Sequence, residues 1–375
     1  MLPAHTVALD VTGQRFTSWT SLQVSRSLEQ AAASFRLDAF EGASARSPVI
    51  VRPQSSCRVT LSTDGRAPVT LITGYVDDVD VSSGIEGTAV SIVGRSSTCD
   101  LIDCMEPSGA HRWTNTTVLG IAQSLAEGYG VEVVADVDVG RPLPRFAAQP
   151  TERIFETIER AARLRSLLVT DDADGRLVLT RAGPTAMRGS LIDGQNTIRM
   201  RCSYAGSGRY SEIVCRGQRA TDAETSASDA ASVEASAADP SVSRRRVLTI
   251  RAEGRTDPAA CLERARWEML TRYGRSTRVS VDVPGWVNAA GELWTVNRLQ
   301  HVRSDAALLD GVLLIVAVTF SRSTAGTTTT LELQPPEAFA QYQPPTVKAG
   351  KRKPVGYWLT AALALAAQSK ARATR

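Results

Sequence analysis

The sequence predicts a mainly β protein with α+β parts: two similar β-barrel domains, an inserted α/β domain and a second small insertion. Three observations predict this architecture. Apolar residues alternate at strand period through residues 1–100, and the same pattern returns at 191–220 and 276–336. Helix-period segments lie only between these stretches, within 101–190 and within 221–275. At 375 residues the chain is long enough for several domains with cores of their own.

Residues 1–100 are predicted to form the first β-barrel. Turn residues, Asp64-Gly65 and Ser83-Gly84 among them, separate short alternating runs, and no helix-period segment interrupts them. The alternating apolar positions include Phe35, Leu37, Ala39, Val59, Leu61, Val90 and Ile92.

Residues 101–190 are predicted to form the α/β domain. A first helix carries Val118, Ile121, Ala122 and Leu125 on one face, with Asn115 or Thr116 as its cap and Gly128 just past its end. A second helix begins near Thr151 and presents Ile154, Phe155, Ile158 and Ala162. A hairpin follows, with strands at 167–169 and 177–179 around the turn 172–175.

Residues 191–220 and 276–336 together are predicted to form the second β-barrel, and residues 221–275 form the insertion within it. Residues 221–243 are rich in Ala, Ser, Asp, Glu and Thr without an aromatic side chain, which predicts a mobile acidic surface loop. A helix is expected over 258–273, because Asp257 followed by Pro258 is a favourable helix start.

Residues 337–375 are predicted to be a basic C-terminal tail. The whole chain carries a net charge of +4, and seven Lys and Arg residues with no acid follow Glu337, so residues 1–347 carry a net charge of −3. A basic nucleic-acid-binding surface on the folded body is therefore not implied. Trp358, Leu359 and Leu363 belong to a short apolar stripe, which indicates either a segment that docks on a partner or a frayed terminus.

The cysteines and the N-terminus indicate in which cellular compartment the chain folds. The six cysteines show no Cys-x-x-Cys pair, so they are interpreted as small apolar residues; a Cys99–Cys104 bridge is sterically conceivable but disfavoured in a reducing cytoplasm. The first residues show no basic region followed by an apolar one, so no secretory signal is recognised and we expect the chain to fold in the cytoplasm.

No catalytic, cofactor-binding or metal-binding set is recognised. His5, His111 and His301 are far apart and lie outside nucleophile or metal motifs. Asp77, Asp78 and Asp80 could hold calcium, but a solvated strand edge or an inter-subunit polar contact is favoured. The turn at 172–175 lacks the downstream Glu of a calcium loop, so it is interpreted as a hairpin turn.

The tryptophans divide into core and interface candidates. Trp267 and Trp294 are assigned to the core. Trp286 is assigned to an interface, because it stands between Gly285 and Val287 after Pro284, in a turn that would expose a large ring.

A set of short motifs occurs in a fixed order along the chain. They are Gly74-Tyr75-Val76-Asp77, the string from Gly94 to Cys104, Arg264-Ala265-Arg266-Trp267-Glu268, Gly285-Trp286, Gly291-Glu292-Leu293-Trp294-Thr295-Val296-Asn297 and Leu313-Leu314-Ile315-Val316. The set resembles the baseplate hub (tail hub) proteins of Mu-like contractile-tailed bacteriophages. The resemblance spans roughly residues 5–340, with a departure at Pro150-Thr151-Glu152, where many members have Gly-Glu-Thr.

The resemblance implies a structural role in the virion tail baseplate and no enzyme activity. It implies a homotrimer whose two barrels per chain form a ring of six, with an axial channel through which DNA passes without specific binding. The implied partners are the membrane-piercing spike protein, the tail tube or a tube-initiator protein, the tape-measure protein and other baseplate components. It also makes Tyr75, Asp77, Trp286, Trp294 and Asn297 interface or structural candidates, beside the tail residues above.

Two alternatives remain open at this point. The chain could be the hub-like part of a type VI secretion or tailocin spike complex, although such spikes continue into an OB-fold and a β-helical needle. It could also be a tail-associated cell-wall hydrolase, although no residue pair has the context of a general acid and a nucleophile.

Overall fold

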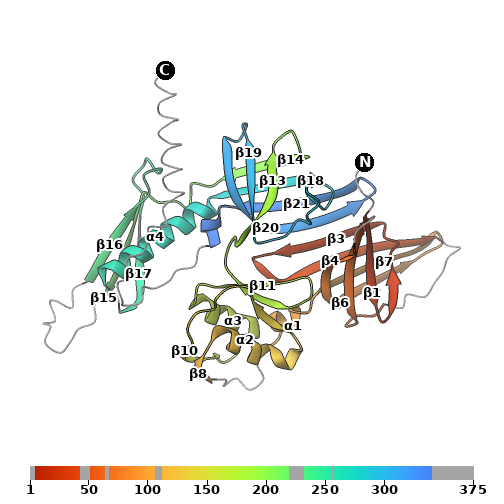
Figure 1. Cartoon of the computed structure of the whole chain (residues 1–375), viewed down its shortest axis with the longest axis horizontal. Coiled ribbons are helices and arrows are strands. Elements are labelled where there is room, and N and C mark those ends of the chain that lie inside the picture. Colours follow the sequence, from red (N-terminus) through yellow and green to blue (C-terminus); the bar gives the residue numbers. More distant parts are fainter. Residues whose placement is uncertain are drawn as a thin grey trace. The chain divides into compact units, whose positions relative to one another are not determined.

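A computed structural model describes residues 5–42, 51–63, 67–105, 112–218, 232–255 and 257–339 (Figure 1). The described chain is mainly β, as predicted. It divides into two compact units, one built from the chain up to Tyr204 and from Gly274 onward, the other from Ala205–Tyr273.

A sheet of thirteen strands dominates the first unit. Its order is β14-β18-β21-β20-β3-β4-β7-β6-β5-β1-β2, and β19 pairs with both β20 and β13. The strands are β1 (His5–Val11), β2 (Gln14–Phe16), β3 (Ser21–Ser27), β4 (Gln30–Gly42), β5 (Ser56–Thr63), β6 (Val69–Ser83), β7 (Gly87–Ser96), β13 (Thr185–Ile192), β14 (Arg199–Tyr204), β18 (Thr277–Pro284), β19 (Arg298–Ser304), β20 (Leu309–Ser323) and β21 (Gly326–Gln334).

The strands of the two expected barrels form one continuous sheet, and among the described residues no strand pairing closes either half. The junction is β20, whose edge opposite β21 pairs first with β19 and then, beyond an irregularity at Ile315/Ala317, with β3. Alternation in a sequence shows which side chains share a face of a strand, but it does not show which strands pair. The pairing of β20 with β3 could therefore not be predicted.

One apolar core lies against this sheet and contains residues from both halves, for example Leu37 and Val59 with Val281 and Leu331. A close approach explains Gly94 of β7. A Cβ at this position would collide with the Phe35 ring and with the carbonyl oxygen of Tyr75. Glycine therefore allows β4 and β6 to pack tightly on both sides of β7.

The α/β domain has a second core of its own, formed by α2, α3 and two small sheets. The predicted hairpin is confirmed, because β11 pairs antiparallel with β12, and β12 pairs in parallel with β9. The elements are α1 (Cys99–Asp103), β8 (Arg112–Thr116), α2 (Val118–Ala126), the 3-10 turn Glu127–Tyr129, β9 (Val133–Ala135), β10 (Leu143–Ala147), α3 (Ile154–Arg163), β11 (Leu168–Asp171) and β12 (Leu177–Thr180).

Several boundaries in this region differ from the predicted ones. Thr117 caps α2 by accepting a hydrogen bond from the Gly120 N–H at 3.1 Å, while Asn115 and Thr116 lie in β8. The helix α3 begins at Ile154, and the Glu156 carboxylate accepts from the Arg153 N–H at 3.0 Å. β13 belongs to the large sheet because it pairs with β19, although its residues up to 190 were assigned to the α/β domain.

The second unit consists of a three-stranded sheet and one long helix. Its strands are β15 (Glu212–Gln218), β16 (Ser232–Ala238) and β17 (Val247–Arg255), in the order β16-β15-β17. The helix α4 (Pro258–Arg275) begins where predicted, with Asp257 accepting from the Ala260 N–H at 2.7 Å. Cys215, Val233 and Cys261 belong to the small core of this unit.

Two features of this unit correct the sequence prediction. Residues 212–218 were assigned to the second barrel but pair with β16 and β17. Part of the expected loop 221–243 is strand β16, since Val233 and Ala237 alternate inward and small side chains suffice for a thin core. Residues 221–231 of that expected loop lie outside the described residues. The predicted tail beyond the 3-10 turn Pro336–Phe339, with Trp358, Leu359 and Leu363, also lies outside them.

Candidate functional surface

One face of the large sheet is lined by hydroxyl-bearing and charged side chains. We call the eight neighbouring strands β14, β18, β21, β20, β3, β4, β7 and β6 the belt. Successive register partners form one polar row across it: Arg199, Asp282, Thr330, Thr319, Ser25, Ser34, Arg95 and Tyr75. Because strand side chains alternate between faces, the apolar neighbours of these residues point to the core.

The polar side chains of this hydroxyl face bond to one another across strands. Ser280 Oγ donates to Glu332 Oε1 at 2.6 Å, and Thr330 Oγ1 donates to Asp282 Oδ1 at 2.7 Å. Two hydroxyls from the two halves of the sheet, Ser25 Oγ and Thr319 Oγ1, lie 3.1 Å apart. Short side chains that satisfy one another make a smooth polar surface.

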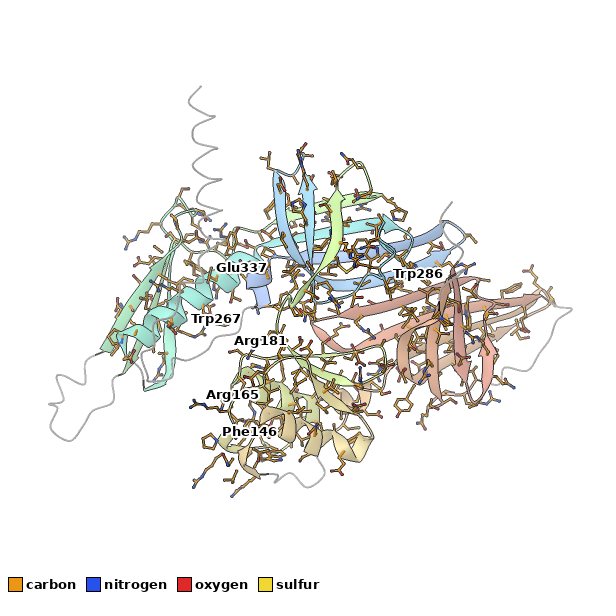
Figure 2. The ribbon with its side chains drawn as sticks, in the orientation of Figure 1. Phe146, Arg165, Arg181, Trp267, Trp286 and Glu337 are labelled. Carbon is orange, nitrogen blue, oxygen red and sulfur yellow. The ribbon has the colours of Figure 1, made fainter. Side chains whose placement is uncertain are left out.

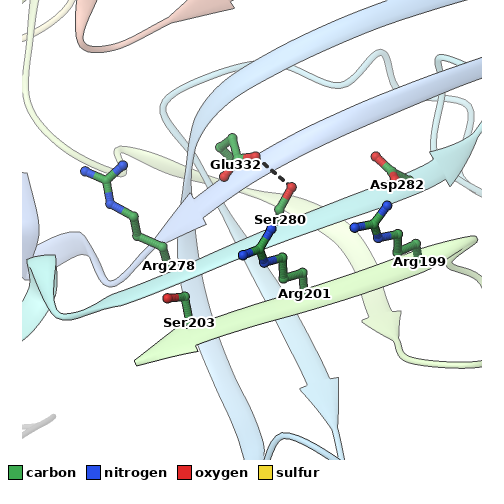
Figure 3. A pocket seen from close by; sticks show the side chains of 7 residues that line it. All are labelled: Arg199, Arg201, Ser203, Arg278, Ser280, Asp282 and Glu332. Carbon is green, nitrogen blue, oxygen red and sulfur yellow. Dashed lines mark hydrogen bonds between the residues drawn. The ribbon is translucent and has the colours of Figure 1, made fainter. Parts of the chain in front are cut away.

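The β14 end of this face is basic. A shallow concavity is lined by Arg199, Arg201 and Arg278 together with Ser203, Ser280, Asp282 and Glu332 (Figure 3). The three arginine side chains project from β14 and β18, and all three residues are exposed. Three arginines against the two carboxylates of Asp282 and Glu332 leave the concavity with an excess of positive charge.

The β6 end holds two of the predicted candidates, Tyr75 and Asp77. Asp77 accepts from Arg95 Nε at 2.8 Å, and Arg95 Nη2 donates to Asp103 at 2.7 Å. The hydrogen bond from Arg95 lowers the pKa of Asp103. Asp77 thus ties the bulge of β6 to β7 and α1, and Tyr75 is half-buried, with its pKa raised by burial.

Trp286 is a core residue, so its assignment to an interface was wrong. It is fully buried, and its Nε1 donates to the carbonyl oxygens of Ser321 at 3.3 Å and Thr328 at 3.1 Å (Figure 2). Its ring packs against Phe320 at a centroid distance of 5.6 Å. Gly285 adopts a left-handed conformation with φ of 73°, and this turn directs the ring inward.

The other two tryptophans differ in burial. Trp294 lies in the core, as predicted. Trp267 is only half-buried on α4, with the Arg264 guanidinium 4.4 Å from its ring centroid.

Asn297 connects the α/β domain to the large sheet. It adopts a left-handed conformation with φ of 61°, which asparagine tolerates better than most residues. Its Oδ1 accepts from the Gly183 N–H at 2.9 Å, and its Nδ2 donates to the Arg181 carbonyl oxygen at 2.9 Å and to Thr180 Oγ1 at 3.2 Å. The sequence motif identified Asn297 as a candidate. In the structure its side chain holds residues 180–183, the segment that leaves the α/β domain.

Arg26 and Asp171 form a second connection, which sequence reasoning missed. The side chain of Asp171 is completely buried, and it lies 3.4 Å from Arg26 Nε and accepts from the Ala33 N–H at 3.0 Å. Burial raises the pKa of Asp171, and the charge of Arg26 opposes that rise. The two residues are far apart in sequence, so no local pattern could indicate the pair.

The remaining candidates show no reactive arrangement. His301 Nε2 lies 2.9 Å from Asp310 Oδ1, only the backbone of His5 is described, and His111 is outside the described residues. The turn at 172–175 is a hairpin turn, as predicted, with Asp172 Oδ1 accepting from the Asp174 and Arg176 N–H groups at 3.0 Å.

Cys99 and Cys104 are free thiols, and burial raises the pKa of Cys99 to about 12. Within the described ranges, no group of three or more His, Cys, Asp and Glu side chains could hold a metal ion. None of the described helices has the length and apolarity that crossing a lipid bilayer requires.

Known proteins resemble this chain over most of its length. Family models match three segments: "Mu phage baseplate assembly protein GpP-like, N-terminal" at residues 6–96, "Baseplate hub protein gp44-like, second domain" at 98–181, and "Mu phage baseplate assembly protein GpP, fourth domain" at 257–342. The baseplate hub protein gp44 of Escherichia phage Mu is 31% identical over 352 residues, covering 90% of this chain and 89% of its own length.

Two solved structures share the fold. The 43 kDa tail protein of prophage MuSo2 from Shewanella oneidensis has a TM-score of 0.77 and 29% identity, covering 89% of this chain and 99% of its own. A tail protein from Neisseria meningitidis MC58 has a TM-score of 0.73 and 21% identity, covering 90% and 99%.

Proposed function

The chain belongs to the family of Mu-like phage baseplate hub proteins, and on that premise we propose that it is the homotrimeric hub of a contractile tail baseplate, with the hydroxyl face lining an axial channel. A protein of this family works in the virion tail, and we expect the chain to fold and assemble in the host cytoplasm before joining it.

The hydroxyl face is the observation that carries this proposal. A wall that lets DNA pass must offer few fixed positive charges, because each phosphate contact would retain the polyanion. Across the middle of the belt the row is formed by Thr330, Thr319, Ser25 and Ser34, all without charge. The net charge of −3 over residues 1–347 is also unsuited to retaining DNA.

We assign the partners from the family. The hub would carry the membrane-piercing spike protein on one side of the ring and meet the tail tube or its initiator on the other, with the tape-measure protein and further baseplate components in contact with it. Because the relative with 31% identity is a phage protein, we place the chain in a phage tail in preference to a type VI secretion complex.

The function is mechanical, so we expect no bond to be made or broken. In the described residues His301 is the histidine with a described side-chain partner, and that partner is Asp310. No set of an activated nucleophile, its base and an orienting group is recognised around it. We therefore expect no hydrolysis of peptidoglycan by this chain.

Native mass spectrometry of the purified protein, alone and mixed with the spike protein of the same tail, tests the proposal. The expected result is a species of three chains that binds the spike. A stable dimer or tetramer in both samples would contradict the trimeric hub.

A further inference from the structure

Among the residues that the structure describes, the belt ends in two strand edges that lack a further partner. At one end β14 pairs with β18 alone among the described residues. At the other end β6 pairs with β5 up to Tyr75, while its segment from Asp78 to Ser83 pairs with β7 only. Unpaired edges of this kind are templates for pairing with another chain.

The directions of these two edges suit a ring. Every neighbouring pair in the belt is antiparallel, and the belt has eight strands, so β14 and β6 run in opposite directions. A second copy rotated about an axis along the strands therefore brings its β14 antiparallel to β6 of the first copy. The same sheet face stays on the inside, as a heterologous ring of identical copies requires.

The charges of the two edges are complementary. Arg199 and Arg201 lie on the hydroxyl face of β14, and Asp78 and Asp80 lie on the same face of β6, as their register partners Val93 and Ser91 show. All four residues are exposed. In the part of the chain that the structure describes, none of their side chains makes a hydrogen bond or an ion pair within the protomer.

We propose that the β14 edge of one protomer pairs antiparallel with the Asp78–Ser83 edge of the next copy of this chain, with Arg199 opposite Asp80 and Arg201 opposite Asp78. This inference rests on the proposed function and deepens it by naming the contact between protomers. Both charge pairs form in a single antiparallel register, because the two arginines and the two aspartates have the same spacing of two residues.

Two-fold alternatives lack this complementarity. A contact between two β14 edges would place arginine beside arginine, and a contact between two β6 edges would place aspartate beside aspartate. Like charges directly opposite one another are destabilising across strands. The charges therefore favour a head-to-tail contact, the type of contact that forms a ring when its rotation closes.

The size of the ring agrees with a channel. Three belts of eight strands give a wall of 24 strands, and at about 4.8 Å per strand the backbone ring is about 37 Å across. Barrels of about 16–18 strands already enclose an aqueous channel. Within one protomer, Arg199 of β14 lies in the same row as Tyr75 of β6. In the proposed contact, Arg199 lies opposite Asp80 of the next copy, two side-chain rows further along β6, and such a stagger accompanies barrel closure.

Charge reversal at each edge tests the contact. Arg199→Asp with Arg201→Asp, and separately Asp78→Arg with Asp80→Arg, should each weaken trimerisation by about tenfold or more at every contact, since two attractions become repulsions. The chain with all four substitutions should trimerise again. Analytical ultracentrifugation over a range of concentrations measures the trimer fraction, and circular dichroism checks that each variant is folded.

Mixing the two reversed variants adds a sharper test. Opposite charges meet only where one variant neighbours the other. Two variants cannot alternate around a ring of three, so at least one contact in each mixed trimer joins like charges. The mixture should therefore form fewer closed trimers than the chain with all four substitutions, in which every contact joins opposite charges. A misfolded protein cannot produce this difference.

A matched control carries Arg112→Asp and Arg145→Asp, the same change of charge on exposed residues of β8 and β10, and should trimerise like the wild type. If the wild type forms trimers and both reversed variants do so equally well, the edge contact is refuted while the hub function stands. If the wild type forms no trimer alone or with the spike, the proposed function fails first. Loss of DNA retention without loss of trimers in the arginine variant would assign these arginines to the channel and also refute the contact.

Discussion

Replacement of Asn297 should loosen the attachment of the α/β domain. Asn297→Ala removes three side-chain hydrogen bonds, to Gly183, Arg181 and Thr180, and at about 1 kcal/mol each they contribute about 3 kcal/mol. Alanine also has to adopt the left-handed conformation with φ of 61°, which adds about 1 kcal/mol. The expected loss is therefore about 4 kcal/mol.

Asn297→Gly separates the two contributions. Glycine adopts positive φ without a steric cost, so this variant should lose only about 3 kcal/mol, the share of the hydrogen bonds. Asn297→Asp retains an acceptor for the Gly183 N–H but presents an oxygen to the Arg181 carbonyl, so it should also be destabilised. An exposed asparagine, Asn196, provides the control, since Asn196→Ala affects only a local turn.

Urea denaturation followed by circular dichroism measures the loss, and trypsin reports the local opening. Arg181 is exposed and stands in the held segment, so cleavage after it should accelerate in Asn297→Ala and less in Asn297→Gly. Wild-type stability in both variants would refute the role of Asn297 as a tether. Equal losses in both would refute the backbone contribution.

Three further outcomes follow from the structure and the sequence. Arg26→Met should cost about 3 kcal/mol at neutral pH by leaving the Asp171 carboxylate unpaired. The substitution raises the pKa of Asp171 in the folded state further above its ordinary value. The loss of stability, measured by urea titration, should therefore grow as the pH rises above the ordinary aspartate range, and it should become independent of pH when Asp171→Asn is added; a constant loss would contradict this. Truncation after Gln343 should leave folding and trimerisation intact but prevent completion of tails, with normal tail yields counting against a docking role. Zymography should show no clearing of peptidoglycan, and clearing that survives stringent purification would restore the hydrolase alternative.

Local chemistry made the elements predictable. Asp257 and Pro258 indicated the start of α4, and the alternation of Phe35 and Leu37 indicated the inward face of β4. These features depend on neighbours within a few residues, which the sequence displays directly.

Long-range pairing accounts for what the sequence did not predict. The joining of β20 to β3, which unites the expected barrels, depends on residues almost three hundred positions apart, such as Phe320 and Val24. Trp286 was assigned to the surface because its turn residues were visible, whereas the carbonyl groups that receive its N–H belong to β20 and β21. The hydroxyl face likewise emerges only from the register of eight strands, since single serines and threonines carry no signal.

Electron cryo-microscopy of the assembled protein tests the central claim most directly. The predicted map shows three copies around an open hole, with a continuous wall of strands whose Ser25, Ser34, Thr319 and Thr330 side chains face the hole. A ring of another number of copies, or a hole lined by a different surface of the chain, would contradict it.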